Sequence, residues 1–355
     1  MLEKKVWKKS SEPAVTIIVP TYRRPTLLKR AIKSIQNQSY FNIKIYVCDD
    51  ASGDDTEQVV ADIANNDSRV HYHCNEKNLG PLDNAGNAML KVDTPFFAFC
   101  ADDDLFLPCH LENAMGGFEQ YPDAGFSINE TITMDNNGWV PFVSTFDMKQ
   151  GMYDPHNAIM LLLKKEAAML LASVIRKEVI EKIGVVNSDC GTLADRDFCF
   201  KAAAQFPFVI TKKPGYIFRI HSSNFFASEM SQHQWLQWQK YFQNSMENPF
   251  LDEKTKEAVE YHLGRRLRSM VKNQGWEAII NKDYDTADLC SQILKDFFKS
   301  TRYPLKLGLL RLTCKIFPAF RWYLKLIKVL RFKKKIYKSN IRYRDYQKYR
   351  KFLNG

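Results

Sequence analysis

The chain has 355 residues, of which 45% are hydrophobic and 26% are charged, as is usual for globular proteins. The net charge of +11 is unevenly distributed: residues 301–355 hold 17 Lys and Arg and one acid, whereas residues 1–300 hold 34 Lys and Arg and 39 acids. This balance of +16 against −5 excludes a uniformly basic surface that would wrap nucleic acid. It indicates one local partner for the basic C-terminal region.

The eight cysteines are scattered and form no CxxC pair, so the sequence predicts neither a zinc site nor a disulfide framework. We therefore expect a reducing, cytoplasmic setting. No uncharged apolar stretch approaches about 20 residues, and the basic N-terminal segment is not followed by an apolar run. The sequence thus predicts neither a membrane-spanning helix nor a signal peptide.

The first hundred residues alternate between short apolar runs and helical patterns. Strands are expected at Val15–Pro20, Ile43–Cys48, Val70–Cys74 and Thr94–Cys100, and helices at Pro25–Gln38, Thr56–Asn65 and Leu82–Lys91. This alternation is typical of parallel βαβ units, in which ligands bind beyond the carboxyl ends of the strands.

The pattern changes twice further along the chain. Short helices are expected at Asn157–Lys165 and Lys177–Ile183, a helix at Thr192–Ala204, and a strand, a turn and a strand between Phe208 and His221. Beyond about residue 230 only helical patterns occur, at Ser231–Met246, Asp252–Asn273, Trp276–Ile280 and Thr286–Phe298. The sequence therefore predicts an α/β fold with a mostly parallel sheet, followed by an α-helical C-terminal region.

The basic region has the pattern of an amphipathic helix between residues 303 and 332. Arg321, Lys325 and Lys328 recur at i, i+4 and i+7 and form one polar stripe. Such a helix is typical of attachment to an anionic membrane surface, which high salt would weaken. Packing against a protein partner and pairing into a homo-oligomer are the alternatives. We expect no nucleic-acid partner, because no nucleic-acid-binding motif accompanies the basic residues.

Acidic residues follow two of the expected strands. Asp102, Asp103 and Asp104 directly follow an apolar run, and three adjacent carboxylates repel one another unless a cation compensates them. A divalent ion with its bound phosphate would do so, and a solvated acidic turn is the alternative. Asp49 and Asp50 either accept hydrogen bonds from a ribose or a base, or form an ordinary turn.

Two further pairs of residues, between residues 195 and 221, are candidate functional residues. Asp195 and Asp197 lie in the first turn of an expected helix, where acids are often only stabilising. Arg219 and His221 alternate on one face of an expected strand. The chain has no P-loop, GxGxxG, HExxH or GxSxG motif, which argues against the enzyme classes that depend on them.

Taken together, these segments resemble the family 2 glycosyltransferases, which have the nucleotide-binding GT-A fold. The resemblance covers about residues 14–226. It is carried in order by VTIIVPTYRRPTLLKRAIKSIQNQSY, IYVCDDASGDDT, NLGPLDNAGNAM, FFAFCADDDLFLP with its DxD-type strand end, SVIRKEVIEKIG with ADRDFCFKAA, and IFRIHSSNFF. The chain departs from the family pattern at Gly86, where an Arg is common, at Ala194, where a Glu is common, and near Lys201, where an Arg is common.

The resemblance implies roles for individual residues. The nucleotide-sugar donor would be bound by Pro20, Thr21, Tyr22, Arg24, Asp49, Asp50, Asn78, Gly80, Asn84, Asp102 and Arg219. Mn²⁺ or Mg²⁺ would be bound by Asp102, Asp103, Asp104 and His221. Asp195 would be the general base, with Asp197 as the rival candidate.

The resemblance also implies a function and a domain organisation. We expect an inverting, metal-dependent transferase that moves a hexose or N-acetylhexosamine from a nucleotide sugar, most readily a UDP-sugar, to a hydroxyl of a glycan or lipid-linked acceptor. A nucleotidyltransferase and a non-catalytic sugar-nucleotide-binding module are the alternatives. The expected parts are a catalytic domain at 1–230, with a nucleotide-sugar half at 14–108 and an acceptor half at 109–226, a helical domain at 231–300, and a basic tail at 301–355. The expected location is the cytoplasm, at the inner face of the cell membrane.

Overall fold

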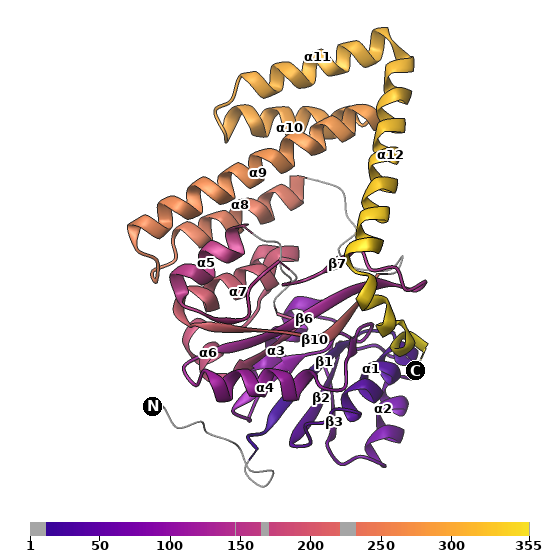
Figure 1. The fold of residues 1–355 in the computed structure, drawn as a ribbon, viewed down its shortest axis with the longest axis vertical. Helices are drawn as coiled ribbons and strands as arrows, with labels where there is room; N and C mark the ends of the chain where they lie inside the picture. The colour runs from indigo at the N-terminus through magenta and orange to yellow at the C-terminus, as the bar shows by residue number, and fades with distance from the viewer. Residues whose placement is uncertain (1–11, 146, 165–169, 221–231, 355) are drawn as a thin grey trace. The chain divides into compact units, whose positions relative to one another are not determined.

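The computed structural model describes residues 12–145, 147–164, 170–220 and 232–354, and the chain divides into two compact units (Figure 1). The sheet unit comprises Met1–Asn224, Asn248–Leu251 and Tyr343–Gly355. The helical unit comprises Phe225–Glu247 and Asp252–Arg342.

Within the described residues the sheet unit is built on one ten-stranded sheet. Its order is β3-β2-β1-β4-β9-β6-β10-β5, with β7 beside β6 and β8 beside β10. The strands are β1 (Val15–Thr21), β2 (Ile43–Asp49), β3 (Val70–Cys74), β4 (Phe96–Phe99), β5 (Leu105–Phe106), β6 (Phe126–Asp135), β7 (Phe142–Val143), β8 (Gly151–Tyr153), β9 (Ser173–Arg176) and β10 (Phe208–Ile220). β1 pairs in parallel with β2 and β4, and β2 with β3, whereas β9 runs antiparallel between β4 and β6. The expected α/β fold with a mostly parallel sheet is confirmed.

Helices flank this sheet because its central strands are apolar on both faces and need cover on both sides (Figure 1). The helices are α1 (Pro25–Gln36), α2 (Thr56–Ala64), α3 (Pro81–Leu90), α4 (His110–Gln120), α5 (Pro155–Lys164), α6 (Lys177–Ile183) and α7 (Ala194–Gln205), and the short 3₁₀ helix η2 (Ser188–Leu193) precedes α7. Both α1 and α3 begin with a proline, whose fixed φ suits the first helical turn.

The turn expected within residues 208–221 is wrong for the described part of that segment. β10 is one continuous strand that pairs in parallel with β6 through Ile220. The register shifts on either side of Pro214, and Lys212 has a positive φ of 55°, so the KKPG segment forms an irregular bulge. Proline and glycine suggested a turn, but a bulge accommodates the missing proline N–H equally well.

The helical unit contains α8 (Gln232–Met246), α9 (Glu253–Asn281), α10 (Tyr284–Asp296), α11 (Arg302–Ile316) and α12 (Pro318–Arg342). The break expected near Gly275 does not occur, because α9 continues through it. A Cβ at Gly275 would lie 2.9 Å from Leu307 Cδ1 and 3.1 Å from Cys290 Cβ. The glycine therefore permits close packing of α10 and α11 on α9. None of the described helices is long and apolar enough to span a membrane.

The expected amphipathic helix over residues 303–332 is two helices. Phe317, with φ −119° and ψ 81°, separates α11 from α12. The following residue, Pro318, disfavours helical geometry at the residue before it, which explains the break.

The last residues of the chain differ from the expected tail, because Tyr343–Gly355 belongs to the sheet unit. Tyr343 and Leu353 are buried in a cluster with apolar residues of β5, β6 and β10. The Tyr346 hydroxyl donates a 2.6 Å hydrogen bond to Glu130 Oε2 on β6. Only Arg302–Arg342 of the basic region lies in the helical unit.

Candidate active site

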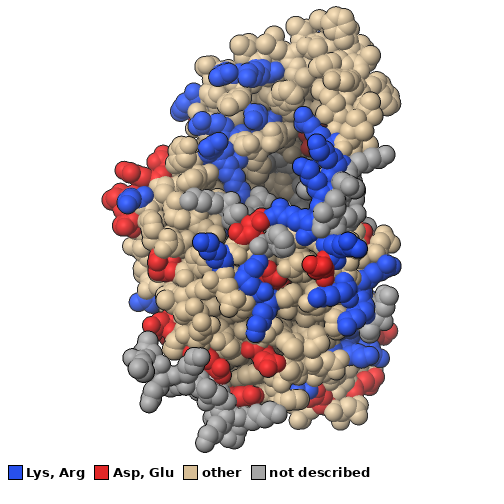
Figure 2. All heavy atoms as spheres, in the orientation of Figure 1, with Lys and Arg blue, Asp and Glu red and all other residues tan. Residues whose placement is uncertain are grey.

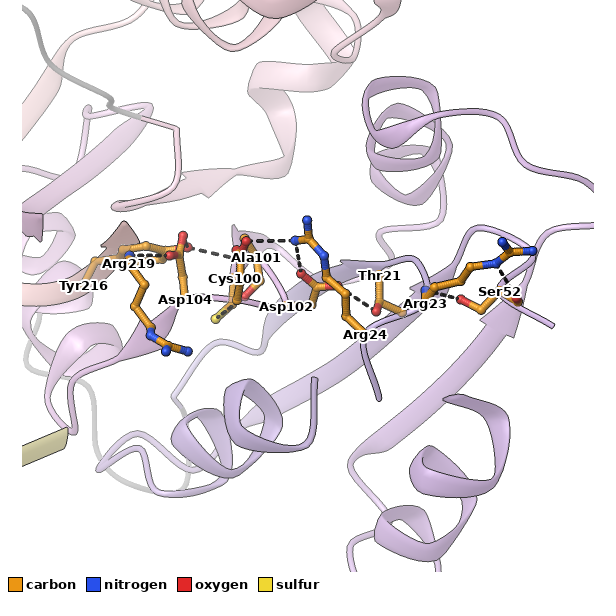
Figure 3. A network of polar contacts seen from close by, with 11 residues as sticks. Thr21, Arg23, Arg24, Ser52, Cys100, Ala101, Asp102, Asp104, Tyr216 and Arg219 are labelled. Atoms are coloured by element: carbon orange, nitrogen blue, oxygen red, sulfur yellow. Dashed lines mark hydrogen bonds and ion pairs between the residues drawn. The ribbon is translucent and has the colours of Figure 1, made fainter. Parts of the chain in front are cut away.

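The carboxyl ends of β1 and β4 meet through side chains of the predicted site (Figure 3). Thr21, the last residue of β1, donates a 2.8 Å hydrogen bond from Oγ1 to Asp102 Oδ2. Thr21 also pairs with Asp49 at the end of β2. Parallel strands place their carboxyl ends on one edge, so three sequence-distant segments converge there.

Arg24 is the cation at this edge. Its Nη1 lies 2.8 Å from Asp103 Oδ2 and 3.2 Å from Asp102 Oδ1. Burial and the neighbouring charge of Asp103 raise the pKa of Asp102 to about 6, while Thr21 and Arg24 act in the opposite direction. For Asp102, burial and repulsion from Asp103 therefore outweigh the stabilisation that Thr21 and Arg24 give to the charged form.

Asp104 is oriented differently from the expectation that it binds metal. Tyr216 donates a 2.9 Å hydrogen bond to its Oδ2, and the Arg219 backbone N–H donates a 2.8 Å bond to its Oδ1. Figure 3 shows Asp104 directed toward these β10 residues, whereas Asp102 is directed toward Thr21 and Arg24. Burial raises the pKa of Asp104 well above its ordinary value, with a further contribution from Asp103. Asp104 joins β10 to the acidic loop, and we retain only Asp102 and Asp103 as candidate ligands.

The remaining donors fit a divalent cation. His221 lies outside the described residues, and within them no group of three or more His, Cys, Asp or Glu side chains is arranged for metal binding. Mg²⁺ commonly uses one or two carboxylates and takes its other ligands from water and substrate phosphates. The hard carboxylate oxygens of Asp102 and Asp103 match that requirement.

Asp49 connects the ends of β2 and β3. Its Oδ2 accepts a 2.6 Å hydrogen bond from the Tyr72 hydroxyl, and its Oδ1 accepts bonds from the N–H and hydroxyl of Ser52. Ser52 Oγ in turn accepts a 2.8 Å bond from the backbone N–H of Arg23. Arg23 has φ 54°, an uncommon value for a residue with a side chain. The sequence analysis did not identify Arg23 and Ser52 as residues of this site. For Arg23, the two adjacent arginines of TYRRP were the available signal.

Asp50 ties down the loop that precedes α3. Its two carboxylate oxygens accept 2.8 Å hydrogen bonds from the backbone N–H groups of Leu79 and Gly80. Gly80 has φ 85°, which favours glycine, and Asn78 Nδ2 donates to the Asp50 carbonyl at 3.2 Å. The structure thus brings Asp50, Asn78 and Gly80 together, with the Asp50 carboxylate hydrogen-bonded to the loop.

The other predicted donor-binding residues lie around these groups. Asn84 is buried and donates a 2.9 Å hydrogen bond to the Cys48 carbonyl. Pro20 pairs with Cys48 in the sheet, and Tyr22 is exposed with the Arg23 guanidinium 5.1 Å from its ring centroid. Asn84 is buried, Pro20 is half-buried and Tyr22 is exposed, so of these three the Tyr22 side chain is the most accessible to a ligand.

The two candidate bases on α7 have different surroundings. Asp197 is buried, and its Oδ2 lies 2.6 Å from Lys201 Nζ one turn later. Asp195 accepts a 2.7 Å hydrogen bond from the backbone N–H of Arg196, and burial raises its pKa. The local environment therefore neutralises the charge of Asp197 with a lysine and makes Asp195 more basic than an ordinary aspartate.

Helix α3 joins the donor side of the sheet to the segment that leads into α7. Asp83 accepts 3.0 Å hydrogen bonds from both the N–H and the hydroxyl of Ser188. A Cβ at Gly86 would lie 2.1 Å from the Val186 carbonyl oxygen, so this position has no room for a side chain. The departure from the family pattern at Gly86 thus has a packing reason.

Gly86→Ala is expected to destabilise the protein by about 1–3 kcal/mol, because the backbone at Val186 would have to move. Gly116→Ala, at an exposed position of α4, is the matched control, since its Cβ would have nothing within 4 Å. The control should be neutral or stabilise by roughly 0.5–1 kcal/mol. Urea denaturation measures both, and equal stabilities for the two variants would contradict the contact.

Comparison with known proteins assigns this arrangement to a family. Residues 16–184 match the Glycosyl transferase family 2 pattern, a range that holds the β1, β2 and β4 strand ends, the Asp102–Asp103 pair and α3. This part of the chain belongs to glycosyl transferase family 2.

Two family relatives have assigned substrates. The GalNAc(5)-diNAcBac-PP-undecaprenol beta-1,3-glucosyltransferase of Campylobacter jejuni is 40% identical over 104 residues, which cover 29% of this chain and 34% of that protein. The UDP-Glc:alpha-D-GlcNAc-diphosphoundecaprenol beta-1,3-glucosyltransferase of Escherichia coli is 33% identical over 98 residues, covering 28% and 38%. The matches thus span little more than a third of these relatives.

The fold match extends further than the sequence match. The structure of S. aureus TarS 1–349 in complex with UDP-GlcNAc superposes with a TM-score of 0.61 and 14% identity, over 85% of this chain and 91% of that structure. At this identity the similarity shows the fold alone.

Proposed function

We propose that this chain is an inverting glycosyltransferase that transfers a sugar from a UDP-sugar to a hydroxyl of a lipid-linked acceptor. The observation that carries the proposal is the separation of two acidic groups with different surroundings. Asp102 and Asp103 lie at the β4 strand end beside Arg24, and Asp195 lies on α7 with a raised pKa. Metal binding and proton removal require two such groups.

In the proposed reaction the acceptor oxygen forms a bond to the anomeric carbon as the bond to the diphosphate oxygen breaks. Asp195 removes the proton of the acceptor hydroxyl, and UDP leaves from the opposite side of the sugar. Asp102 and Asp103 would hold Mn²⁺ or Mg²⁺, which neutralises the charge of the leaving diphosphate. Arg24 adds a fixed positive charge beside them. The hydrogen bonds from Ser188 to Asp83 fix the segment that leads into α7, and hence Asp195, against helix α3 on the donor side of the sheet.

Two named relatives support the substrate classes. Both the Campylobacter and the E. coli enzymes carry undecaprenol diphosphate in the names of their acceptors, and the E. coli name specifies UDP-Glc. We accordingly propose peripheral location at the inner face of the cell membrane, with attachment through the C-terminal helices. Which hexose or N-acetylhexosamine is transferred is decided by the experiment below.

We expect metal-dependent release of UDP when the full chain meets its donor and a short-chain polyprenyl-diphosphate-linked sugar. UDP-glucose, UDP-GlcNAc and UDP-GalNAc should each be tested with Mn²⁺, Mg²⁺ or EDTA, and mass spectrometry should show the acceptor gaining one sugar. Chelation should lower the rate by about 100-fold or more, since the metal contributes several kcal/mol to such transition states. Tight UDP binding without turnover on any acceptor would instead indicate a binding module.

A further inference from the structure

Helix α11 has apolar residues on two opposite faces. Its inner face packs Leu307, Leu310 and Cys314 into the core of the helical unit. Its outer face repeats at i, i+4, i+7 and i+11 and consists of Leu305, Leu309, Leu312 and Ile316, each between 53% and 65% exposed. The inner face accounts for the folding of this helix, so the outer face is not needed for the core.

Helix α12 repeats this arrangement. Phe320 and Leu324 pack against the same core. On another side, Trp322, Leu326 and Val329 recur at i, i+4 and i+7, and Trp322 is 75% exposed. A large aromatic side chain left this exposed on an ordered helix is unusual in a soluble monomer when it belongs to an apolar cluster.

The bend between the two helices continues the apolar surface. Phe317, which separates α11 from α12, is 62% exposed. Figure 2 shows a continuous area without Lys, Arg, Asp or Glu on the visible face where the described helices α11 and α12 meet. We call Leu305, Leu309, Leu312, Ile316, Phe317, Trp322, Leu326 and Val329 the outer apolar surface.

The charge of the two helices selects the partner of this surface. Arg302–Arg342 contains 13 Lys and Arg and no acid. Two of these cations pair inside the helical unit, Arg311 with Asp288 and Lys328 with Glu277. A second copy docking through the same surface would oppose like charges, whereas an anionic lipid surface would attract them.

We propose that the outer apolar surface inserts into the headgroup and acyl-chain boundary of a lipid bilayer, with the flanking Lys and Arg on the phosphates. Exposed cations such as Lys306, Lys315 and Lys325 lie on the same helices. Trp322 is suited to the interfacial depth, where its ring is amphipathic. This mode goes beyond charge attraction to the membrane, and it deepens the proposed location without depending on catalysis.

If the outer apolar surface inserts into the bilayer, vesicle binding should persist in part at high salt. The full chain should cosediment with phosphatidylcholine vesicles containing phosphatidylglycerol, and part of the binding should remain in about 1 M salt, where the Debye length is ~3 Å. The variant Leu309→Ser/Leu312→Ser/Trp322→Ser/Leu326→Ser should lose about 10⁴-fold in partition coefficient, since each of the four inserted apolar side chains contributes roughly tenfold. The charge variant Lys306→Gln/Lys315→Gln/Lys325→Gln should lose binding mainly at low salt.

Controls keep this test separate from folding and activity. Phe41→Ser/Leu236→Ser removes two exposed apolar side chains that are not part of the outer apolar surface, and this variant should bind vesicles normally. All variants should transfer sugar equally well to a detergent-soluble acceptor, so a failure of the proposed reaction would be seen independently. Complete loss of binding in high salt, or normal binding of the apolar variant, would overturn the proposal. So would light scattering that shows a dimer of the full chain which the apolar variant abolishes.

Discussion

Asp195→Asn should lower the rate of sugar transfer by roughly 10²–10⁴-fold, the usual contribution of a positioned general base. The amide has nearly the same shape but cannot take the acceptor proton. Because burial raises the pKa of Asp195, its charged form is disfavoured in the folded protein. Folding stability is therefore lost as pH rises from the ordinary aspartate pKa toward the raised one. The Asn variant should lack that loss and be at least as stable at neutral pH.

Asp197→Asn is the matched control on the same helix turn. Asp197 lies 2.6 Å from Lys201, so its replacement leaves a lysine without its partner. We expect a measurable loss of stability and a smaller loss of rate than for Asp195→Asn. Steady-state rates and thermal unfolding of the two variants separate the roles. A large rate loss confined to Asp197→Asn would reverse the assignment of the base.

The acidic run should divide into a metal-binding part and a structural part when its members are replaced singly. Asp104→Ala would leave the Tyr216 hydroxyl and the Arg219 N–H without their acceptor in the interior. At ~1–3 kcal/mol for each of the two buried unsatisfied groups, the expected cost is about 2–6 kcal/mol. Asp104→Asn should cost less, because it keeps one carbonyl oxygen for the Arg219 N–H.

Asp103→Ala should destabilise the protein less than Asp104→Ala, because its ion pair with the partly exposed Arg24 contributes little and its repulsion with Asp102 is removed. It should instead weaken binding of Mn²⁺ in the presence of UDP and lower the transfer rate by about 100-fold or more. Urea denaturation and calorimetric Mn²⁺ titration read the two effects separately. If Asp104→Ala folded normally while losing Mn²⁺, the orientation of that carboxylate would have to be reassigned.

Local sequence patterns predicted much of the sheet and of its functional edge. Short apolar runs that alternate with helical patterns favour buried parallel strands, and the polar residues that follow such strands lie at the carboxyl edge of the sheet. The positions of Thr21, Asp49 and Asp102 follow from this reasoning alone. In the structure these residues lie close together, because the carboxyl ends of neighbouring parallel strands share one edge of the sheet.

Glycine and proline residues were poorer predictors of where helices end and where turns occur. Gly275 reads as a helix break but lies at a close helix contact, and the Pro214–Gly215 pair reads as a turn but lies in a bulge. The same residue types serve turns, bulges and tight packing, and only the neighbours decide which. The break between α11 and α12 at Phe317 has a local cause, since Pro318 disfavours helical geometry at the residue before it.

The sequence by itself determined the fold class, the strand-end acids and the concentration of positive charge near the C-terminus, because each depends on residues adjacent in the chain. Only the tertiary structure decided the orientation of Asp104, which is set by Tyr216 and Arg219 more than 100 residues away. The tertiary structure also divides the basic region, because Tyr343–Gly355 belongs to the sheet unit. It leaves an exposed apolar surface on α11 and α12. Contacts between distant segments have no signature in local periodicity, and which apolar face is left uncovered depends on what the rest of the chain supplies.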